Sequence, residues 1–240
     1  MPVHEARLTR RESVAEGTMA FYFSRPPGFR HRAGQSLLMT LVDPPETDDE
    51  GDARTFTIAS APHEAELMIA TRMRDTAFKR VLKAAPVGTA LRIDGPNGEM
   101  VLHEDTTRPA VFLAGGIGIT PFLSIARDAA ERSLPHRIYL FYSNRRPEDA
   151  AFLGELQEMM RLNGNYRLIA TMTEAEKSAQ PWAGERGFIR RELLERHLPD
   201  FVGPVYYFAG PPAMTMAMQE LLQGIGVGEQ AMRYEEFYGY

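Results

Sequence analysis

The stretch VFLAGGIGITP, residues Val111 to Pro121, decides the fold of this chain. Four apolar residues at its start predict a buried strand, and the proline at its end predicts the first turn of a helix. The glycines between them allow a ligand to approach the backbone, and the free N–H groups of a helix start attract phosphate. The stretch therefore predicts a turn that can hold a pyrophosphate. A tight turn for close packing of helix on strand explains the glycines equally well.

The sequence after this stretch alternates between strand and helix patterns. Expected strands are Arg137–Ser143, Tyr166–Thr171 and Val205–Ala209, and expected helices are Pro121–Glu131, one opening at Pro147, Arg190–Arg196 and Pro212–Gln223. This alternation predicts a doubly wound parallel sheet. A second turn, Ala209-Gly210-Pro211-Pro212, lies at the same edge of that sheet, where ligands of such sheets bind. Two turns at one edge favour a dinucleotide crevice.

The sequence before residue 104 has the pattern of short antiparallel strands. Expected strands are Thr18–Ser24, Gln35–Val42, Arg54–Ala59, Glu66–Met73 and Thr89–Ile93, separated by turn residues. One helix is expected at Ala77–Ala85, with Asp75 or Thr76 as its N-cap. This spacing predicts a barrel, and the boundary between the two parts falls in the polar stretch between Glu104 and Arg108.

Composition excludes several classes of protein. The 240 residues are 44% hydrophobic and 25% charged, so the chain is globular rather than disordered. The absence of cysteine excludes disulfides, cysteine-bound clusters and thiol nucleophiles, so redox chemistry requires an organic cofactor. The six histidines lack a metal-binding spacing, so no metal site is expected. With a net charge of −5 and no long basic run, nucleic acid is not an expected partner.

Membrane insertion is not expected either. The two long uncharged stretches, Ala110–Ala126 and Phe201–Gln219, are interrupted by glycines and prolines, so each is interpreted as a strand, turn and helix start. The first residues, MPVHEARLTRRES, are charged and contain no apolar targeting segment. The expected location is the cytoplasm.

Motifs in order along nearly the whole chain resemble the ferredoxin–NADP reductase superfamily. They are Ala33-Gly34-Gln35, Arg54-Thr55-Phe56-Thr57-Ile58-Ala59-Ser60, Gly95-Pro96-Asn97-Gly98, GGIGITP, Ser143-Asn144-Arg145, AGPP and Tyr234-Glu235-Glu236-Phe237. The closest resemblance is to cysteine-free, two-domain members. It implies a six-stranded antiparallel Greek-key barrel that binds FAD, residues 1–104, and an α/β domain with a doubly wound parallel sheet that binds NAD(P), residues 105–240.

The resemblance implies a flavin site in the first part. Arg54 would bind a phosphate as a permanent cation, Phe56 would offer an aromatic face, and Thr57 would hydrogen-bond the N5/O4 edge of the ring. Taken alone, Arg54 is more typical of a surface charge, Phe56 of a barrel core and Thr57 of an ordinary strand residue. The remaining implied flavin contacts are Ser60, Thr71, Arg72, Thr76, Ala77, Phe78 and Lys79. The start of the helix, Thr76 to Lys79, would hold a pyrophosphate, which favours FAD over FMN.

The resemblance also implies a nicotinamide-nucleotide site in the second part. Its implied residues are Gly116, Gly118, Thr120, Pro121, Ser143, Asn144, Arg145, Gly210, Pro211 and Met214. Ser143 to Arg145 would suit a 2′-phosphate, but the acids Glu148 and Asp149 follow closely, so NADH and NADPH both remain open.

Four positions depart from the family pattern. Phe56 replaces a tyrosine, Lys79 replaces a small hydroxyl residue, and Ala209 replaces the cysteine beside the reacting nicotinamide carbon. At the C-terminus, either Phe237 or Tyr240 would cover the flavin.

The implied activity is that of an NAD(P)H-dependent flavoprotein reductase. Hydride would pass from NADPH or NADH to FAD, and electrons would pass on to ferredoxin, flavodoxin, an oxygenase component or a small acceptor. Thr57, Glu235, Phe237 and Tyr240 are the implied catalytic residues. The alternative is a non-catalytic flavin-containing electron-transfer or regulatory subunit, against which the intact GGIGITP motif speaks.

Overall fold

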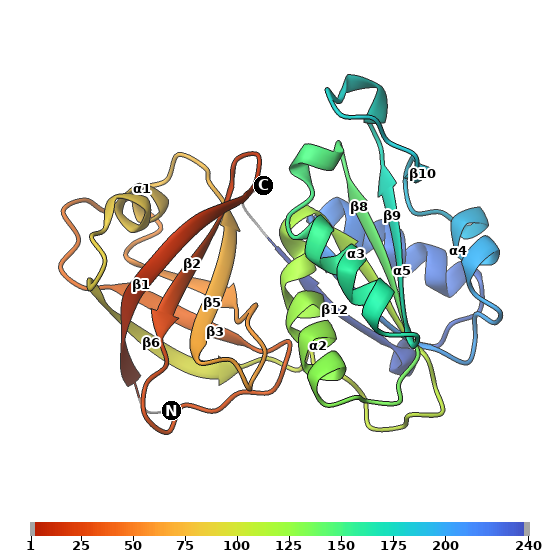
Figure 1. Ribbon diagram of the computed structural model, residues 1–240, viewed down its shortest axis with the longest axis horizontal. Helices are drawn as coiled ribbons and strands as arrows, with labels where there is room; N and C mark the ends of the chain where they lie inside the picture. The colour runs from red at the N-terminus through yellow and green to blue at the C-terminus, as the bar shows by residue number, and fades with distance from the viewer. Residues whose placement is uncertain (1–2, 238–240) are drawn as a thin grey trace.

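A computed structural model describes residues 3–237 and contains two six-stranded sheets that lie side by side (Figure 1). The first sheet is antiparallel, with strand order β4-β3-β6-β1-β2-β5. Its strands are β1 (Val3–Ala15), β2 (Thr18–Ser24), β3 (Ser36–Leu41), β4 (Ala53–Thr57), β5 (Glu66–Arg72) and β6 (Ala90–Asn97). The edge strands β4 and β5 contact each other, so the sheet closes on itself, and helix α1 (Ala77–Ala84) follows β5.

The first sheet has a core inside it and a second packing surface outside. On β2, Phe21 and Phe23 point into the inner core, whereas Ala20 and Tyr22 belong to the core shared with the other sheet. This alternation follows from the two-residue period of a strand. Both faces of β2 are therefore buried, which explains its uninterrupted apolar sequence.

Strand β1 was not expected from the sequence. Its exposed positions carry charges such as Glu5 and Arg7, and these made the N-terminal residues resemble a charged tail. Between them, Ala6 and Leu8 are buried in the inner core. The alternation of buried and exposed side chains that is typical of a strand is thus present. It is hard to detect in the sequence because only two residues are buried among many charged ones.

The second sheet is parallel throughout, with strand order β10-β9-β8-β7-β11-β12. Its strands are β7 (Ala110–Gly115), β8 (Ile138–Asn144), β9 (Tyr166–Met172), β10 (Glu185–Arg186), β11 (Val205–Gly210) and β12 (Met232–Glu236). The helices are α2 (Thr120–Glu131), α3 (Leu153–Leu162), α4 (Arg191–His197) and α5 (Pro212–Gly224). Short 3-10 turns are η1 (Gly116–Ile119), η2 (Pro147–Asp149), η3 (Ala175–Lys177) and η4 (Glu229–Ala231).

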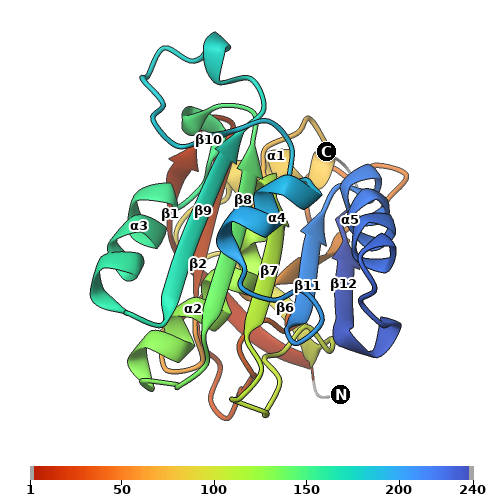
Figure 2. The same cartoon turned by 90° about the vertical axis from the view of Figure 1, so that its right-hand side faces the viewer.

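Helices cover both faces of this sheet. Phe112 of β7 packs with α2 and α3 on the face toward the first sheet, and α2 lies between the two sheets (Figure 1). Val111 and Leu113 pack with α4 and α5 on the other face, which Figure 2 shows in front of the strands. The predicted fold class, an antiparallel barrel followed by a doubly wound parallel sheet, is confirmed.

Some expected elements differ from those observed. The helix expected to open at Pro147 is only the 3-10 turn η2, and α3 begins at Leu153. The Asp149 carboxylate accepts two hydrogen bonds from the Arg146 guanidinium, each 2.9 Å long, and Phe152 has a φ of 61° that a helix cannot continue through.

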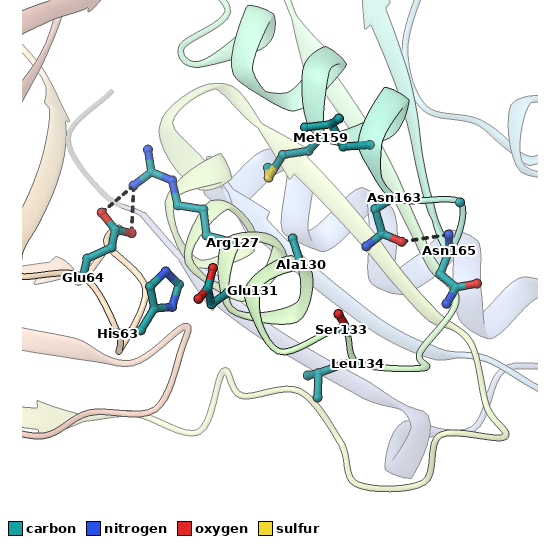
Figure 3. Close-up of a pocket in the computed structure, with 12 residues that line it drawn as sticks. His63, Glu64, Arg127, Ala130, Glu131, Ser133, Leu134, Met159, Asn163 and Asn165 are labelled. Atoms are coloured by element: carbon teal, nitrogen blue, oxygen red, sulfur yellow. Dashed lines mark hydrogen bonds and ion pairs between the residues drawn. The ribbon is translucent and has the colours of Figure 1, made fainter.

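The two sheets are joined by polar contacts as well as by the shared apolar core. The Ser124 hydroxyl of α2 donates to the Ser60 carbonyl at 2.8 Å and accepts from the Gly34 N–H at 3.3 Å. About one turn further along α2, the Arg127 guanidinium lies 3.3 Å from the Glu64 carboxylate (Figure 3) and 2.6 Å from that of Glu155. These contacts fix α2 between the two sheets.

In the described residues, no helix combines the length and apolar character that membrane crossing requires.

We expect Gly118→Ala to destabilise the fold by about 3 kcal/mol, because overpacking against a backbone leaves no flexible atom to yield. A Cβ at this position would lie 2.1 Å from the Ala209 carbonyl oxygen. The control is Gly154→Ala in α3, where a Cβ meets nothing within 4 Å. This control should stabilise the helix by about 0.5–1 kcal/mol. Urea unfolding of both variants measures the difference, and equal stabilities would contradict the packing role.

Candidate functional site

Two cavities meet at the carboxyl ends of the parallel strands. The first, which we name the intersheet cavity, has a volume of about 550 Å³ and lies between β4, β5, the turn η1 and the residues that end β12. The second, the strand-edge cavity, has a volume of about 1110 Å³ and lies over the ends of β7, β8 and β9 and beside α5. Arg72 and Arg74 line both cavities, so the two spaces adjoin.

The intersheet cavity collects most of the residues implied as the flavin site. It is lined by Arg54, Phe56, Thr57, Thr71, Arg72, Thr76, Lys79, Thr120, Glu235 and Phe237. Phe56 also packs on the inner core, with its ring 5.7 Å from that of Phe78. Thr57 is buried, with 7% of its surface exposed. Residues of the first sheet and residues at the end of β12 therefore line the same cavity.

Glu235 is the carboxyl group that burial affects most clearly in this cavity. It lies on β12 beside Ala209 of β11, and burial raises its pKa to about 7. Gly98 faces it, because a Cβ on Gly98 would lie 3.3 Å from Glu235 Oε1. Desolvation disfavours the charged form, so this carboxyl group can keep its proton close to neutral pH.

The Arg54 guanidinium is bound by its own loop. Its Nη1 donates to the carbonyl oxygens of Glu50 (2.8 Å), Gly51 (3.1 Å) and Ala53 (2.8 Å). Its Nη2 lies 3.1 Å from Asp48 Oδ1 and 2.9 Å from Glu50 Oε2. The predicted phosphate-binding cation lines the cavity as expected, but its donors are held by the loop between β3 and β4, residues 42–52, which we name the acidic loop.

The start of α1 is partly as expected. Thr76 is the N-cap, and its hydroxyl accepts from the Lys79 N–H at 3.4 Å. The Lys79 ammonium, however, donates to the Arg72 carbonyl at 2.7 Å, and burial lowers its pKa. The Ala77 N–H donates to Asp48 Oδ2 at 2.8 Å. A donor expected for a pyrophosphate is thus also held by the acidic loop.

The strand-edge cavity collects six of the ten residues implied for the nicotinamide nucleotide, whereas Thr120 lines the intersheet cavity instead. It is lined by Gly116, Ser143, Asn144, Arg145, Pro211 and Met214, together with Gly115. Gly115 leaves room for Met214, because a Cβ there would lie 2.2 Å from the Met214 sulfur. Asn144 is 6% exposed, and its Nδ2 has no hydrogen-bond partner within residues 3–237. A buried amide without a partner favours a ligand that supplies an acceptor.

Several implied residues line neither cavity. They are Ser60, Ala77, Phe78, Gly118, Pro121 and Gly210. Ser60 is fully buried, and its hydroxyl accepts a hydrogen bond from the Met68 N–H at 2.9 Å. Its carbonyl accepts the hydrogen bond from the Ser124 hydroxyl of α2. Phe78 belongs to the inner core, and Gly118 allows η1 to approach β11. The structure gives these three packing roles, and Tyr240 lies outside the described residues.

The cavities also contain residues that sequence reasoning missed. Arg74 lines both cavities, while Glu174, Phe188 and Arg190 line the strand-edge cavity. Glu174 follows β9, so the rule that ligands bind at strand ends could have found it. Phe188, with 65% of its surface exposed, comes from the segment between β10 and α4 and matches no motif.

Comparison with known proteins agrees with this arrangement. Residues 112–220 match the model of the oxidoreductase NAD-binding domain family. Ferredoxin–NADP reductase B of Sorangium cellulosum is 27% identical over 244 residues, with 97% of both chains covered. The chain is therefore similar to ferredoxin–NADP reductases in sequence and in fold. The pairing of a closed antiparallel sheet with a parallel one agrees with this similarity.

Two further comparisons, one of sequence and one of structure, support the similarity. The glycine betaine monooxygenase reductase subunit of Chromohalobacter salexigens is 27% identical over 241 residues, which cover 98% of this chain and 64% of that protein. The chain thus spans less than two thirds of that relative. The crystal structure of a ferredoxin NADP+ reductase from Neisseria gonorrhoeae with bound FAD and NADP has the same fold, with a TM-score of 0.82, 20% identity, and 98% and 99% of the two chains covered.

The raised pKa of Glu235 makes the stability of the protein depend on pH. The folded protein holds this proton up to about pH 7, whereas the unfolded chain releases it near the ordinary value of 4.5. Stability is therefore lost as pH rises through this window. We expect Glu235→Gln to match the wild type at pH 4.5 and to exceed it at pH 8 by roughly 1–3 kcal/mol. Urea unfolding at both pH values measures this, with the exposed Glu99→Gln as the control. An equal gain at both pH values would contradict the assignment.

Proposed function

We propose that the chain is an NAD(P)H-dependent flavoprotein reductase, which transfers hydride from NADPH or NADH to FAD and passes electrons to an acceptor. The observation that carries this proposal is the junction of the two cavities at Arg72 and Arg74. A flavin ring in the intersheet cavity and a nicotinamide entering from the strand-edge cavity could meet there. Hydride transfer requires such close approach and little else from the protein.

The intersheet cavity fits the ring of a flavin. Phe56 offers an apolar aromatic face, Thr57 a hydroxyl group that can bind the ring edge, and Phe237 closes the cavity near the end of β12. The phosphate end fits less well as the structure stands. Arg54 and the Ala77 N–H, the two donors best suited to a phosphate, both bind Asp48.

The strand-edge cavity suits a dinucleotide. Gly116 has a φ of 54° and belongs to the turn before α2, where backbone N–H groups favour an anion. The buried Asn144 amide offers a hydrogen-bond donor, and Arg145 and Arg190 add positive charge. These cations could serve a pyrophosphate or a 2′-phosphate, so both nucleotides are tested below.

When bound, a flavin supplies the exchange between two-electron and one-electron chemistry. The side chains of the chain would orient the ring and exclude water. Thr57 would fix the ring edge, and Glu235, with its pKa raised to about 7, would hold a proton on its carboxyl group beside the ring. No metal ligand is needed, and residues 3–237 contain no group of three or more His, Asp or Glu suited to one.

The names of the relatives suggest the acceptor. One relative is a ferredoxin–NADP reductase, and another is the reductase component of a propane 2-monooxygenase from Rhodococcus jostii. We therefore propose an oxygenase component or a carrier of the ferredoxin or flavodoxin type as the protein acceptor. The FAD-binding part, residues 1–104, the NAD(P)-binding part, residues 105–240, and the cytoplasmic location stay predictions.

The decisive experiment is anaerobic mixing of the protein, supplied with FAD, with NADH or with NADPH. Bleaching of the flavin absorbance is expected with at least one nucleotide. Flavin that binds but is reduced by neither nucleotide would favour the non-catalytic subunit instead.

We expect Ala213→Trp to raise the KM for the pyridine nucleotide about tenfold or more, because the indole would fill part of the strand-edge cavity. Ala213 lines this cavity from α5. Flavin affinity should stay unchanged. Met216→Trp on the same helix is the control, since Met216 is exposed and lines neither cavity. A similar KM in both variants would remove the strand-edge cavity from the site.

A further inference from the structure

The acidic loop between β3 and β4 is fastened over the start of α1. Glu46 accepts two hydrogen bonds from the Arg80 guanidinium of α1, at 3.0 and 2.6 Å. Two residues further along, Asp48 accepts a hydrogen bond from the Ala77 N–H, and after two more residues Glu50 Oε2 lies 2.9 Å from Arg54 Nη2. The loop is thus held at three points, and each point is a carboxylate.

Asp48 makes the contacts that a phosphate group would make. Its Oδ2 accepts from the Ala77 N–H at 2.8 Å, and its Oδ1 accepts from Arg54 Nη2 at 3.1 Å and from the Glu50 N–H at 3.1 Å. A helix N–H and a guanidinium are the donors that bind phosphate most strongly. The Ala77 N–H also holds the pKa of Asp48 below its ordinary value, so the group is charged at neutral pH.

Two further donors beside this anchor are already committed within the protein. Arg54 is 17% exposed, and its Nη1 is committed to three carbonyl oxygens. The Lys79 ammonium donates to the Arg72 carbonyl. A phosphate that enters here must therefore displace Asp48 or lie against its negative charge.

We propose that Asp48, assisted by Glu50, is an internal substitute for the flavin phosphate and determines which flavins the chain prefers. This inference rests on the proposed function, because it assumes a flavin ring in the intersheet cavity. Because Asp48 already binds the donors suited to a phosphate, the flavin ring supplies most of the binding free energy. The chain then discriminates little between riboflavin and FAD, and its flavin exchanges with flavin in solution.

The test is equilibrium binding of riboflavin and of FAD to the flavin-free full-length protein, followed by flavin fluorescence. The wild type should bind both flavins with Kd values within about threefold of each other. Asp48→Asn should bind FAD about tenfold more tightly and riboflavin unchanged, because a like charge is removed while an oxygen remains to accept from the Ala77 N–H. Glu50→Gln, an exposed position, should give a smaller gain in the same direction.

The matched control is Asp49→Asn, which removes the same charge from an exposed position between the two. Asp49→Asn should leave the affinities for riboflavin and for FAD at the wild-type values. The comparison thereby separates the competition of Asp48 with the phosphate from a general effect of net charge. An unchanged or weaker affinity for FAD in Asp48→Asn, or an equal gain in Asp49→Asn, would overturn the inference while riboflavin binding upholds the flavin site. Failure of every variant to bind either flavin would overturn the proposed function itself.

Discussion

The close approach of the turn η1 to the backbone of β11 is the constraint on which the site depends. Gly118 has no side chain, and any Cβ would collide with the Ala209 carbonyl. Because the turn sits directly on the neighbouring strand, Ile117 and Thr120 face the intersheet cavity while Gly115 and Gly116 face the strand-edge cavity. One turn of backbone thereby forms part of the wall of both spaces, which adjoin at Arg72 and Arg74.

Regular elements with a strong apolar period could be predicted from the sequence. The bounds of β2 agree at both ends, and Thr76 caps α1 as one of two expected residues. Strand β1 could not be predicted in the same way, because its exposed charges outnumber its buried residues. The 3-10 turn η2 was mistaken for a helix start, since proline followed by acidic residues suits both structures.

The site was predictable where motifs carry it and unpredictable where long-range polar contacts decide it. Phe56, Thr57 and Glu235 lie far apart in sequence, and the resemblance to a family brought them together correctly around one cavity. The partners of Arg54 could not be foreseen, because the loop that supplies them has no periodicity and its fold is set by the charges it meets. The same holds for Ser60, whose motif position suggested a ligand contact although its hydroxyl and carbonyl are used within the protein.

Helix α2 connects this chemistry to a distant electrostatic contact. Its first residue lines the intersheet cavity, and Arg127, about 10 Å further along the axis at 1.5 Å per residue, is held between Glu64 of the loop between β4 and β5 and Glu155 of α3. Dissolved salt weakens partly exposed ion pairs of this kind. The ionic strength of the surroundings therefore acts on the strength of this ion pair between the two parts of the molecule, as well as on the attraction of a charged molecule to the cavities.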